Sequence, residues 1–179
     1  MLIEVLLVQA FWIIGSAYAA NAFPPLVSGH RPLDKGKIFH GRRLLGDGKT
    51  YEGTLAGIIF GLFYGAVQIL VQPYIPLNIS GKELGLITIT PIIVILLVVG
   101  TMIGDIAGSF IKRRIGLERG ASAPGMDQLG FIIIGLLFVS LVAPISIEIW
   151  IIIIVLTPII HWLANLIGYY LMKVKKTPW

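Results

Sequence analysis

The sequence predicts an all-α, polytopic integral membrane protein with five transmembrane helices. Of its 179 residues, 56% are apolar and only 13% are charged, and the mean hydropathy is +0.91, which is too apolar for an ordinary soluble domain. Five charge-free stretches are 25, 29, 21, 20 and 24 residues long, at positions 5–29, 53–81, 84–104, 128–147 and 149–172. Each can hold a bilayer-spanning helix, which needs about 20 residues. Basic residues also gather in alternate connections.

The spans are expected at about residues 3–22, 53–72, 85–108, 128–144 and 148–171, with longer connections at about 23–52 and 109–127. They occupy most of the chain, so residues 1–179 form a single membrane-embedded domain. This composition excludes a disordered regulator and argues against a nucleic-acid-binding module. Any chemistry must therefore lie in the connections or at helix ends.

The first span has an alternative interpretation as a cleaved signal peptide, because Ala20-Asn21-Ala22 resembles a small-residue cleavage site. Residues 1–4 contain Glu4 and lack Lys and Arg, whereas a signal peptide begins with a positively charged region. We therefore interpret residues 3–22 as a membrane span.

Glycines recur every four residues in the second and third spans, at positions 53, 57, 61 and 65 and at positions 100, 104 and 108. Small-residue faces let helix backbones approach closely in lipid, so we expect these faces to bring the polar ends of the two spans together. In the last span, Pro158 predicts a kink. His161 and Asn165 share a face there and suit hydrogen bonds between helices.

The distribution of Lys and Arg predicts the orientation of the chain. Six lie in the first connection, four follow the third span and three lie in the tail, whereas the second connection has only Lys82. Basic residues favour the cytoplasmic side of a membrane. The N-terminus is therefore expected outside, and the C-terminus and both basic connections in the cytoplasm, in a multi-pass protein of the cell membrane.

Asp105 and Asp127 are the candidate metal ligands. A carboxylate near the membrane is costly unless it faces a cation or a polar interior. Helical spacing places Asp105, Ser109 and Lys112 on one face, and Asp127 opens the fourth span at the same depth. Two carboxylates among basic residues suit Mg²⁺ carrying a polyphosphate. Two alternatives remain open: a structural ion pair of Asp105 with Lys112 or Arg113, and Asp127 as a helix N-terminal charge.

The first connection contains Gly48-Lys49-Thr50 just before the second span. The triplet resembles the end of a phosphate-binding P-loop, but Arg43 stands where that motif needs glycine, and the motif should follow a β-strand, so a P-loop fold is rejected. The free N–H groups of a helix start still favour an anion beside Lys49 and Thr50. The alternative is a purely topogenic basic loop.

Two blocks resemble the signature of the phosphatidate cytidylyltransferases: Ser109-Phe110-Ile111-Lys112-Arg113 and Pro124-Gly125-Met126-Asp127. The chain is more similar to the archaeal branch, the CDP-archaeol synthases, because the likeness extends to Ala20-Asn21-Ala22-Phe23-Pro24, to Asp34-x-Gly36-Lys37 and to residues 41–50. The sequence departs from the broader signature at Glu118-Arg119, Gln128 and Gly130, and it lacks a His-Gly-Gly element before Asp127. None of these departures removes the candidate pair Asp105 and Asp127.

The resemblance implies transfer of a cytidylyl group from CTP to 2,3-bis-O-geranylgeranyl-glycerol 1-phosphate. On this basis we assign Asp105 and Asp127 to Mg²⁺, and Lys112 to catalysis. Expected contacts to CTP or to the lipid phosphate are Lys49, Thr50, Arg113, Asn21, Arg42, Arg43 and Lys37. The expected partners are CTP, the isoprenoid ether-lipid phosphate and membrane lipids. A homodimer is left open, and nucleic acid is not expected.

Three other classes are compatible with a small polytopic chain. A transporter would place ionisable residues near the middle of the membrane, whereas Asp105 and Asp127 are expected at one side. A lipid kinase would share the basic loops and the metal carboxylates, and would differ in the nucleotide that it uses. A structural membrane subunit would leave the two aspartates and Lys49 without a purpose.

Overall fold

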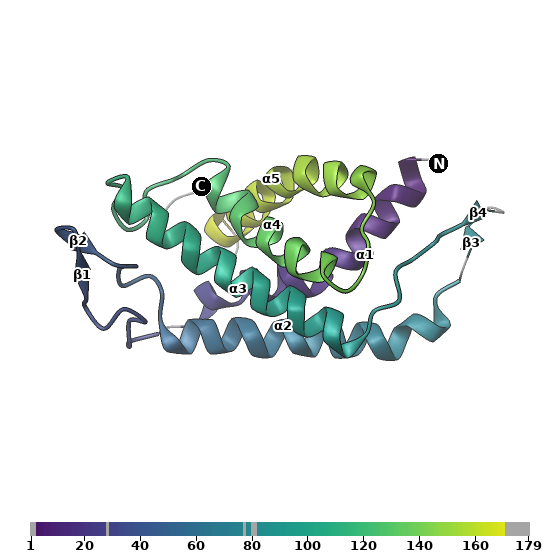
Figure 1. Ribbon diagram of the computed structural model, residues 1–179, viewed down its shortest axis with the longest axis horizontal. Coiled ribbons are helices and arrows are strands. Elements are labelled where there is room, and N and C mark those ends of the chain that lie inside the picture. Colours follow the sequence, from purple (N-terminus) through teal and green to yellow (C-terminus); the bar gives the residue numbers. More distant parts are fainter. Residues whose placement is uncertain (1–2, 28, 77, 80–81, 171–179) are drawn as a thin grey trace.

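Five α-helices and two small hairpins make up the part of the chain that the computed structural model describes, which is residues 3–27, 29–76, 78–79 and 82–170 (Figure 1). The helices are α1 (Ile3–Ala22), α2 (Tyr51–Val71), α3 (Pro91–Arg114), α4 (Met126–Ser140) and α5 (Ile147–Tyr170). Short 3-10 turns, η1 (Pro24–Leu26) and η2 (Gln72–Tyr74), follow α1 and α2. Antiparallel hairpins pair β1 (Ile38–Phe39) with β2 (Arg42–Arg43) and β3 (Asn78–Ile79) with β4 (Lys82–Glu83).

Four helical segments among the described residues are long and apolar enough to cross a membrane, each of 24 residues: Ile3–Leu26, Tyr51–Tyr74, Pro91–Arg114 and Ile147–Tyr170. The helical membrane-protein class is therefore confirmed. The fourth expected span is present as the apolar helix α4, but its 15 residues are fewer than the roughly 20 of a full crossing.

The third helix begins later than predicted. A span starting near residue 85 was expected, but α3 starts at Pro91, with Thr90 as the N-terminal cap. A proline disfavours helical geometry in the residue before it, which explains this boundary. Residues 84–90 form no regular secondary structure and lie against α1, where the Gln9 amide donates to the Leu84 carbonyl at 2.6 Å and the Trp12 indole N–H donates to the Ile87 carbonyl at 3.0 Å. The α3 helix also continues past residue 108 to Arg114.

The glycines of α2 and α3 pack closely against neighbouring helices, as expected for small-residue faces. The α2 glycines face α1 and α3: a Cβ atom on Gly57 would lie 2.6 Å from the Ala20 carbonyl oxygen, and one on Gly61 would lie 2.7 Å from Val98. The α3 glycines face α4 instead, since a Cβ atom on Gly104 would lie 2.5 Å from the Gly130 carbonyl oxygen. The α2 glycines therefore let α2 pack against α3, and the polar ends of the two spans do come together, since Lys49 just before α2 contacts Asp105 of α3, whereas the α3 glycines serve the contact with α4.

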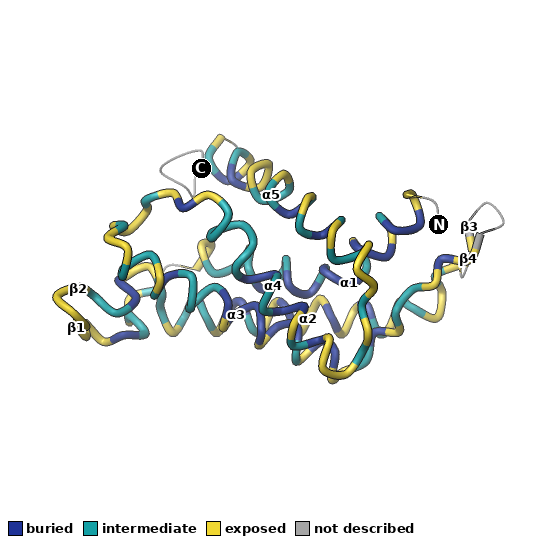
Figure 2. Tube along the Cα trace, turned by 45° about the horizontal axis from the view of Figure 1, so that its top comes forward, coloured by how far each residue is buried: buried dark blue, intermediate teal, exposed yellow. Residues whose placement is uncertain are grey.

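The core lies where α1, α3 and α4 meet, and α2 and α5 pack on its outside. Large apolar side chains remain exposed on the outer helices, including Leu55, Phe63 and Leu70 on α2 and Ile151 and Val155 on α5. Figure 2 shows this exposure along α5. Continuous apolar surface of this kind suits contact with lipid rather than water.

Polar contacts hold α5 in place. The Tyr18 hydroxyl of α1 donates to Thr157 at 2.8 Å, and the Thr157 hydroxyl donates to the Ile153 carbonyl at 2.6 Å. Within α5, Asn165 and His161 approach each other at 3.3 Å, which confirms that they share a face. Pro158 lies inside the same helix, as expected.

The two hairpins lie at opposite ends of the long axis of the molecule (Figure 1). The end that carries β1 and β2, here called the β1–β2 end, also holds the start of α2 and the end of α3, because Arg42 of β2 donates to the carbonyls of Arg113 and Arg114. Basic residues of the first and third connections therefore share one end, whereas Lys82 lies in β4 at the other. This arrangement confirms the predicted alternation of the connections.

Candidate active site

Two ion pairs lie at the β1–β2 end of the helices. Lys49, just before α2, donates from Nζ to Oδ2 of Asp105 on α3. Lys112 on α3 donates from Nζ to Oδ1 of Asp127 on α4 at 2.5 Å. The four side chains are 18–29% exposed. Each candidate metal ligand is therefore partly shielded from solvent and faces an ammonium group.

Asp105 and Asp127 line one small cavity of about 10 Å³, together with Ser109 and Lys112. This volume holds about one water-sized particle. The close approach of α3 and α4 at Gly104 and Gly130 brings the two carboxylates to the same cavity. Three residues predicted for catalysis and metal binding thus meet, whereas the predicted alternative pairing of Asp105 with Lys112 is replaced by pairing with Lys49.

The loop before α4 orients the Asp127 side chain. Its Oδ2 atom accepts a hydrogen bond from the Ala123 backbone N–H at 3.0 Å, while Oδ1 accepts from Lys112. Gly125 permits the tight turn, since its φ of +82° lies in the left-handed region. Asp127 occupies the first turn of α4, so the predicted helix N-terminal position also holds.

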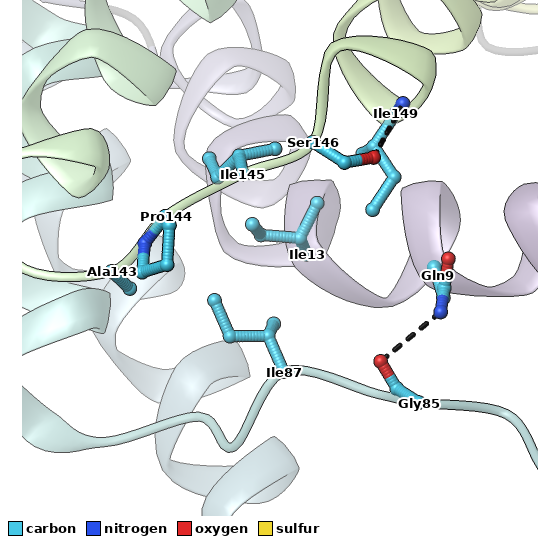
Figure 3. A pocket seen from close by; sticks show the side chains of 9 residues that line it. All are labelled: Gln9, Ile13, Gly85, Ile87, Ala143, Pro144, Ile145, Ser146 and Ile149. Carbon is cyan, nitrogen blue, oxygen red and sulfur yellow. Dashed lines mark hydrogen bonds between the residues drawn. The ribbon is translucent and has the colours of Figure 1, made fainter.

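A larger cavity of about 360 Å³ lies between α1, the segment before α3 and the connection from α4 to α5 (Figure 3). Its lining is mainly apolar, with Ile13, Ile87, Ile145 and Ile149 among the wall residues. None of the predicted site residues lines it. Although this cavity is larger, its apolar lining does not suit the binding of phosphates or a metal ion.

Asp34 organises the first connection. The side chain is buried, and its two oxygens accept from Arg43 at 2.7 and 3.2 Å, from the Leu45 and Gly46 N–H groups at 3.0 and 2.9 Å, and from Gly36 at 3.1 Å. The hydrogen bond from Arg43 is the main cause that holds the pKa of Asp34 well below its usual range, and the backbone N–H groups act in the same direction. Asp34 was not among the residues predicted for the site. The spacing Asp34-x-Gly36 could have indicated it, because an aspartate two residues before a glycine favours a turn closed by its own side chain.

Three of the arginines predicted to contact substrate also hold the connections together. Arg43 pairs with Asp34 and, at 2.7 Å, with Asp47. Arg42 donates to the Arg113 and Arg114 carbonyls, both at 3.3 Å, and Arg113 donates to the Leu45 and Leu117 carbonyls. The last carbonyls of a helix lack i+4 partners within it, so Arg42 adds a donor to two carbonyls of the last turn of α3, of which that of Arg113 also accepts from the Gly116 N–H at 3.3 Å.

The remaining predicted residues take different positions. Thr50 caps α2, accepting from the Gly53 N–H at 3.1 Å. Lys37 is exposed next to β1, and Asn21 is half-buried in the last turn of α1. Neither Lys37 nor Asn21 lines the cavity between the carboxylates.

Within the described residues, no three His, Cys, Asp or Glu side chains form a cluster that could hold a metal ion. Asp105 and Asp127 are the two carboxylates that would hold Mg²⁺. Mg²⁺ commonly binds through one or two carboxylates, with waters and substrate phosphates as its other ligands. The donor set and the shared cavity thus fit that ion.

Long apolar helices with two carboxylates and two lysines gathered at one end define a polytopic membrane protein with a charged site at the ends of its helices. The chain belongs to the CarS-like CDP-archaeol synthase family, whose model matches residues 2–179.

Named relatives support this membership over nearly the full length. The CDP-archaeol synthase of Thermococcus kodakarensis is 45% identical over 173 residues, covering 95% of each chain. That of Methanococcus aeolicus is 44% identical over 175 residues, covering 96% of each. A solved structure described as an intramembrane enzyme for archaeal membrane lipids biosynthesis is 34% identical, with a TM-score of 0.75 over 89% of this chain and 94% of that one.

Proposed function

We propose that this protein is a CTP-dependent cytidylyltransferase of archaeal ether-lipid biosynthesis. It moves CMP from CTP to an isoprenoid glycerol ether-lipid phosphate and gives CDP-archaeol and pyrophosphate. Relatives that align over nearly the full chain carry the name CDP-archaeol synthase. The observation that carries the proposal is the meeting of Asp105 and Asp127 at one cavity beside Lys112, with Lys49 paired to Asp105.

The chemistry matches the residues at hand. An oxygen of the lipid phosphate attacks the α-phosphorus of CTP, a new P–O bond forms, and the bond to the pyrophosphate leaving group breaks. Because the attacking phosphate is already anionic, the reaction needs no strong general base. Positioning and charge neutralisation are then the main demands on the protein, as in phosphoryl transfer.

Lys49 and Lys112 supply movable positive charge at the site. Each ammonium group now neutralises one carboxylate. Phosphate oxygens of CTP compete for these donors, so we assign both lysines to the triphosphate and Asp105 and Asp127 to Mg²⁺. When bound, Mg²⁺ would neutralise charge on the phosphates and on the leaving group. Arg42, Arg43, Arg113, Lys37, Thr50 and Asn21 stay as proposed substrate contacts around this centre.

We further propose five membrane passages, with the N-terminus outside and the charged site on the cytoplasmic side of the cell membrane. The helix α4 rises about 22 Å, from 15 residues at about 1.5 Å each, and would form a short fourth passage. The concentration of Lys and Arg at the β1–β2 end supports this orientation.

Rival activities are less well supported. A transporter would need ionisable groups along a path through the bundle, whereas Asp105 and Asp127 lie at one end. Deeper polar side chains bond between helices instead, as where Ser16 donates to Gln68 at 2.8 Å. A lipid kinase remains the closest competitor, and nucleotide choice separates it from a cytidylyltransferase.

The test is the thermal stability of the detergent-purified full chain with CTP, ATP, GTP or UTP, each with and without Mg²⁺. A ligand that binds only the folded state raises the melting temperature. Selective stabilisation by CTP with Mg²⁺, and pyrophosphate release once the ether-lipid phosphate is added, are expected. Selective stabilisation by ATP would indicate a kinase. No response to any nucleotide, even with the lipid phosphate present, would overturn the proposal.

A further inference from the structure

Arg114, the last residue of α3, donates hydrogen bonds to both strands of the β1–β2 hairpin. Its Nη2 group donates to the Arg43 carbonyl at 2.7 Å and to the Arg42 carbonyl at 3.3 Å, and its Nη1 group donates to the Phe39 carbonyl. One guanidinium therefore joins the end of a long helix to three backbone groups of a short, exposed hairpin. No other contact of this kind ties both strands to a helix in the described part of the chain.

Aromatic rings hold the same guanidinium by its faces. The Arg114 carbon Cζ lies 5.2 Å from the ring centroid of Phe39 on the hairpin and 5.2 Å from that of Phe110 on α3. Both distances are within the range of cation–π attraction. A planar guanidinium can use its edge for carbonyls and its faces for rings, which a lysine ammonium cannot do. The Nε atom of Arg114 is buried and finds no hydrogen-bond partner among the described residues.

The hairpin returns the contact, since Arg42 donates to the carbonyls of Arg113 and Arg114. The hairpin and the end of α3 are thus joined by hydrogen bonds from Arg114 to the hairpin and from Arg42 to α3, and we call this set of contacts the Arg114 clasp. The clasp lies outside the buried core, which is formed by α1, α3 and α4. Loss of the clasp is therefore expected to release the first connection while the helices stay folded.

A short chain of contacts runs from the hairpin to Lys49. Arg43 binds Asp34, and Asp34 accepts from the Leu45 and Gly46 N–H groups. The Gly46 carbonyl then accepts from the Lys49 N–H at 3.4 Å. The Lys49 side chain reaches Asp105.

We infer that Arg114 is a positioning residue of the nucleotide site. It pins the β1–β2 hairpin so that the following loop presents Lys49 beside Asp105, where the triphosphate of the nucleotide is to be held. Its Nη groups are already engaged by hairpin carbonyls, so Arg114 acts through Lys49 and does not itself contact the nucleotide. This inference rests on the function proposed above.

The test compares Arg114→Gln and Arg114→Lys with a charge-matched control, Lys35→Gln. Lys35 is an exposed cation of the first connection, so its removal lowers the charge by the same amount without removing any contact between Arg114 and the hairpin. Both Arg114 variants are expected to weaken CTP binding and raise the KM for CTP by about tenfold or more, as small misplacements of a binding group do. The melting temperature should change little. Amide exchange in residues 38–46 should accelerate.

A double-mutant comparison tests whether Arg114 acts through Lys49. In a Lys49→Ala background, Arg114→Gln should weaken CTP binding by less than about twofold further, because the group that it positions is gone. A full additional loss would overturn the inference, as would a normal CTP affinity in Arg114→Lys, which keeps the charge but loses the clasp. If Lys49→Ala alone left CTP affinity unchanged, the proposed nucleotide site would fail. If Lys49→Ala weakened binding and Arg114→Gln did not, only the positioning role would fail.

Discussion

Lys49 and Asp105 are 56 residues apart in sequence, yet the Lys49 ammonium group donates directly to the Asp105 carboxylate. This contact joins the loop before α2 to the C-terminal half of α3. The lysine supplies a counter-charge to the partly buried Asp105 carboxylate, and Lys112 does the same for Asp127. The site therefore carries two carboxylates and two ammonium groups, a balanced set that bound phosphate and metal would both disturb.

Replacing either Asp105 or Asp127 should greatly slow turnover without unfolding the protein. Asp105→Asn and Asp127→Asn each remove a proposed metal ligand and leave one lysine unpaired in a partly exposed setting. The rate of pyrophosphate release from CTP is expected to fall by about a hundredfold or more. Glu118→Gln, which changes an exposed carboxylate in the loop between α3 and α4, is the control. Near-normal turnover in either Asp variant would remove that residue from the metal site.

CTP and Mg²⁺ should strengthen each other's binding. Metal alone must displace Lys49 and Lys112 from the carboxylates and leave two ammonium groups beside a cation. When CTP enters with the metal, its phosphates accept those ammonium groups. The coupling is reciprocal by linkage, so Mg²⁺ should lower the Kd for CTP by the same factor, about fivefold or more, by which CTP lowers the Kd for Mg²⁺. Calorimetric titration of each ligand with and without the other measures both factors, and independent binding would contradict the proposed ligand exchange.

The sequence predicted the five helices and the proximity of the candidate residues Asp105 and Asp127, but not the lysine that each carboxylate contacts. Apolar runs located all five helices, and helical spacing with loop sidedness brought Asp105 and Asp127 to one end. The start of α3 was misplaced because the apolar pattern continues through residues 84–90, while Pro91 sets the helix boundary. Which lysine meets which carboxylate depends on how α3 crosses α4 at Gly104, and periodicity within one helix cannot supply that. Burial of Asp34 likewise arises only when the first connection folds around it.

Asp34 should make the first connection sensitive to acid. Its folded-state pKa lies below the value of about 3.9 in an unfolded chain, so its stabilising contribution is fully present above about pH 4 and is lost as the pH falls through the depressed folded pKa. Asp34→Asn is expected to cost about 1–3 kcal/mol above pH 4, since the amide cannot replace a charged acceptor for Arg43. The difference in melting temperature from the parent protein should narrow below that pH.

The exposed partner of Arg43 provides the control for this experiment. Asp47 is 54% exposed and pairs with the same guanidinium, so Asp47→Asn should cost at most about 1 kcal/mol. Melting temperatures of both variants and of the parent protein, measured between pH 3 and pH 7 (roughly the window set by the aspartate pKa), decide the matter. A constant difference between Asp34→Asn and the parent across that range would show that Asp34 does not titrate as the structure requires.

The contact of α3 with α4 should tolerate a methyl group at one glycine and not at the next. A Cβ atom on Gly104 would lie 2.5 Å from the Gly130 carbonyl oxygen and 2.8 Å from the Phe131 Cα atom, so Gly104→Ala must push two backbones apart. We expect a loss of about 1–3 kcal/mol in unfolding free energy. Gly108→Ala, one turn on, is the matched control: its nearest neighbour would be 3.8 Å away, and alanine is the better helix former. Chemical denaturation of both variants measures the difference. Equal stability would mean that α3 and α4 are not packed as closely as Gly104 requires, and the shared cavity of Asp105 and Asp127 would lose its structural basis.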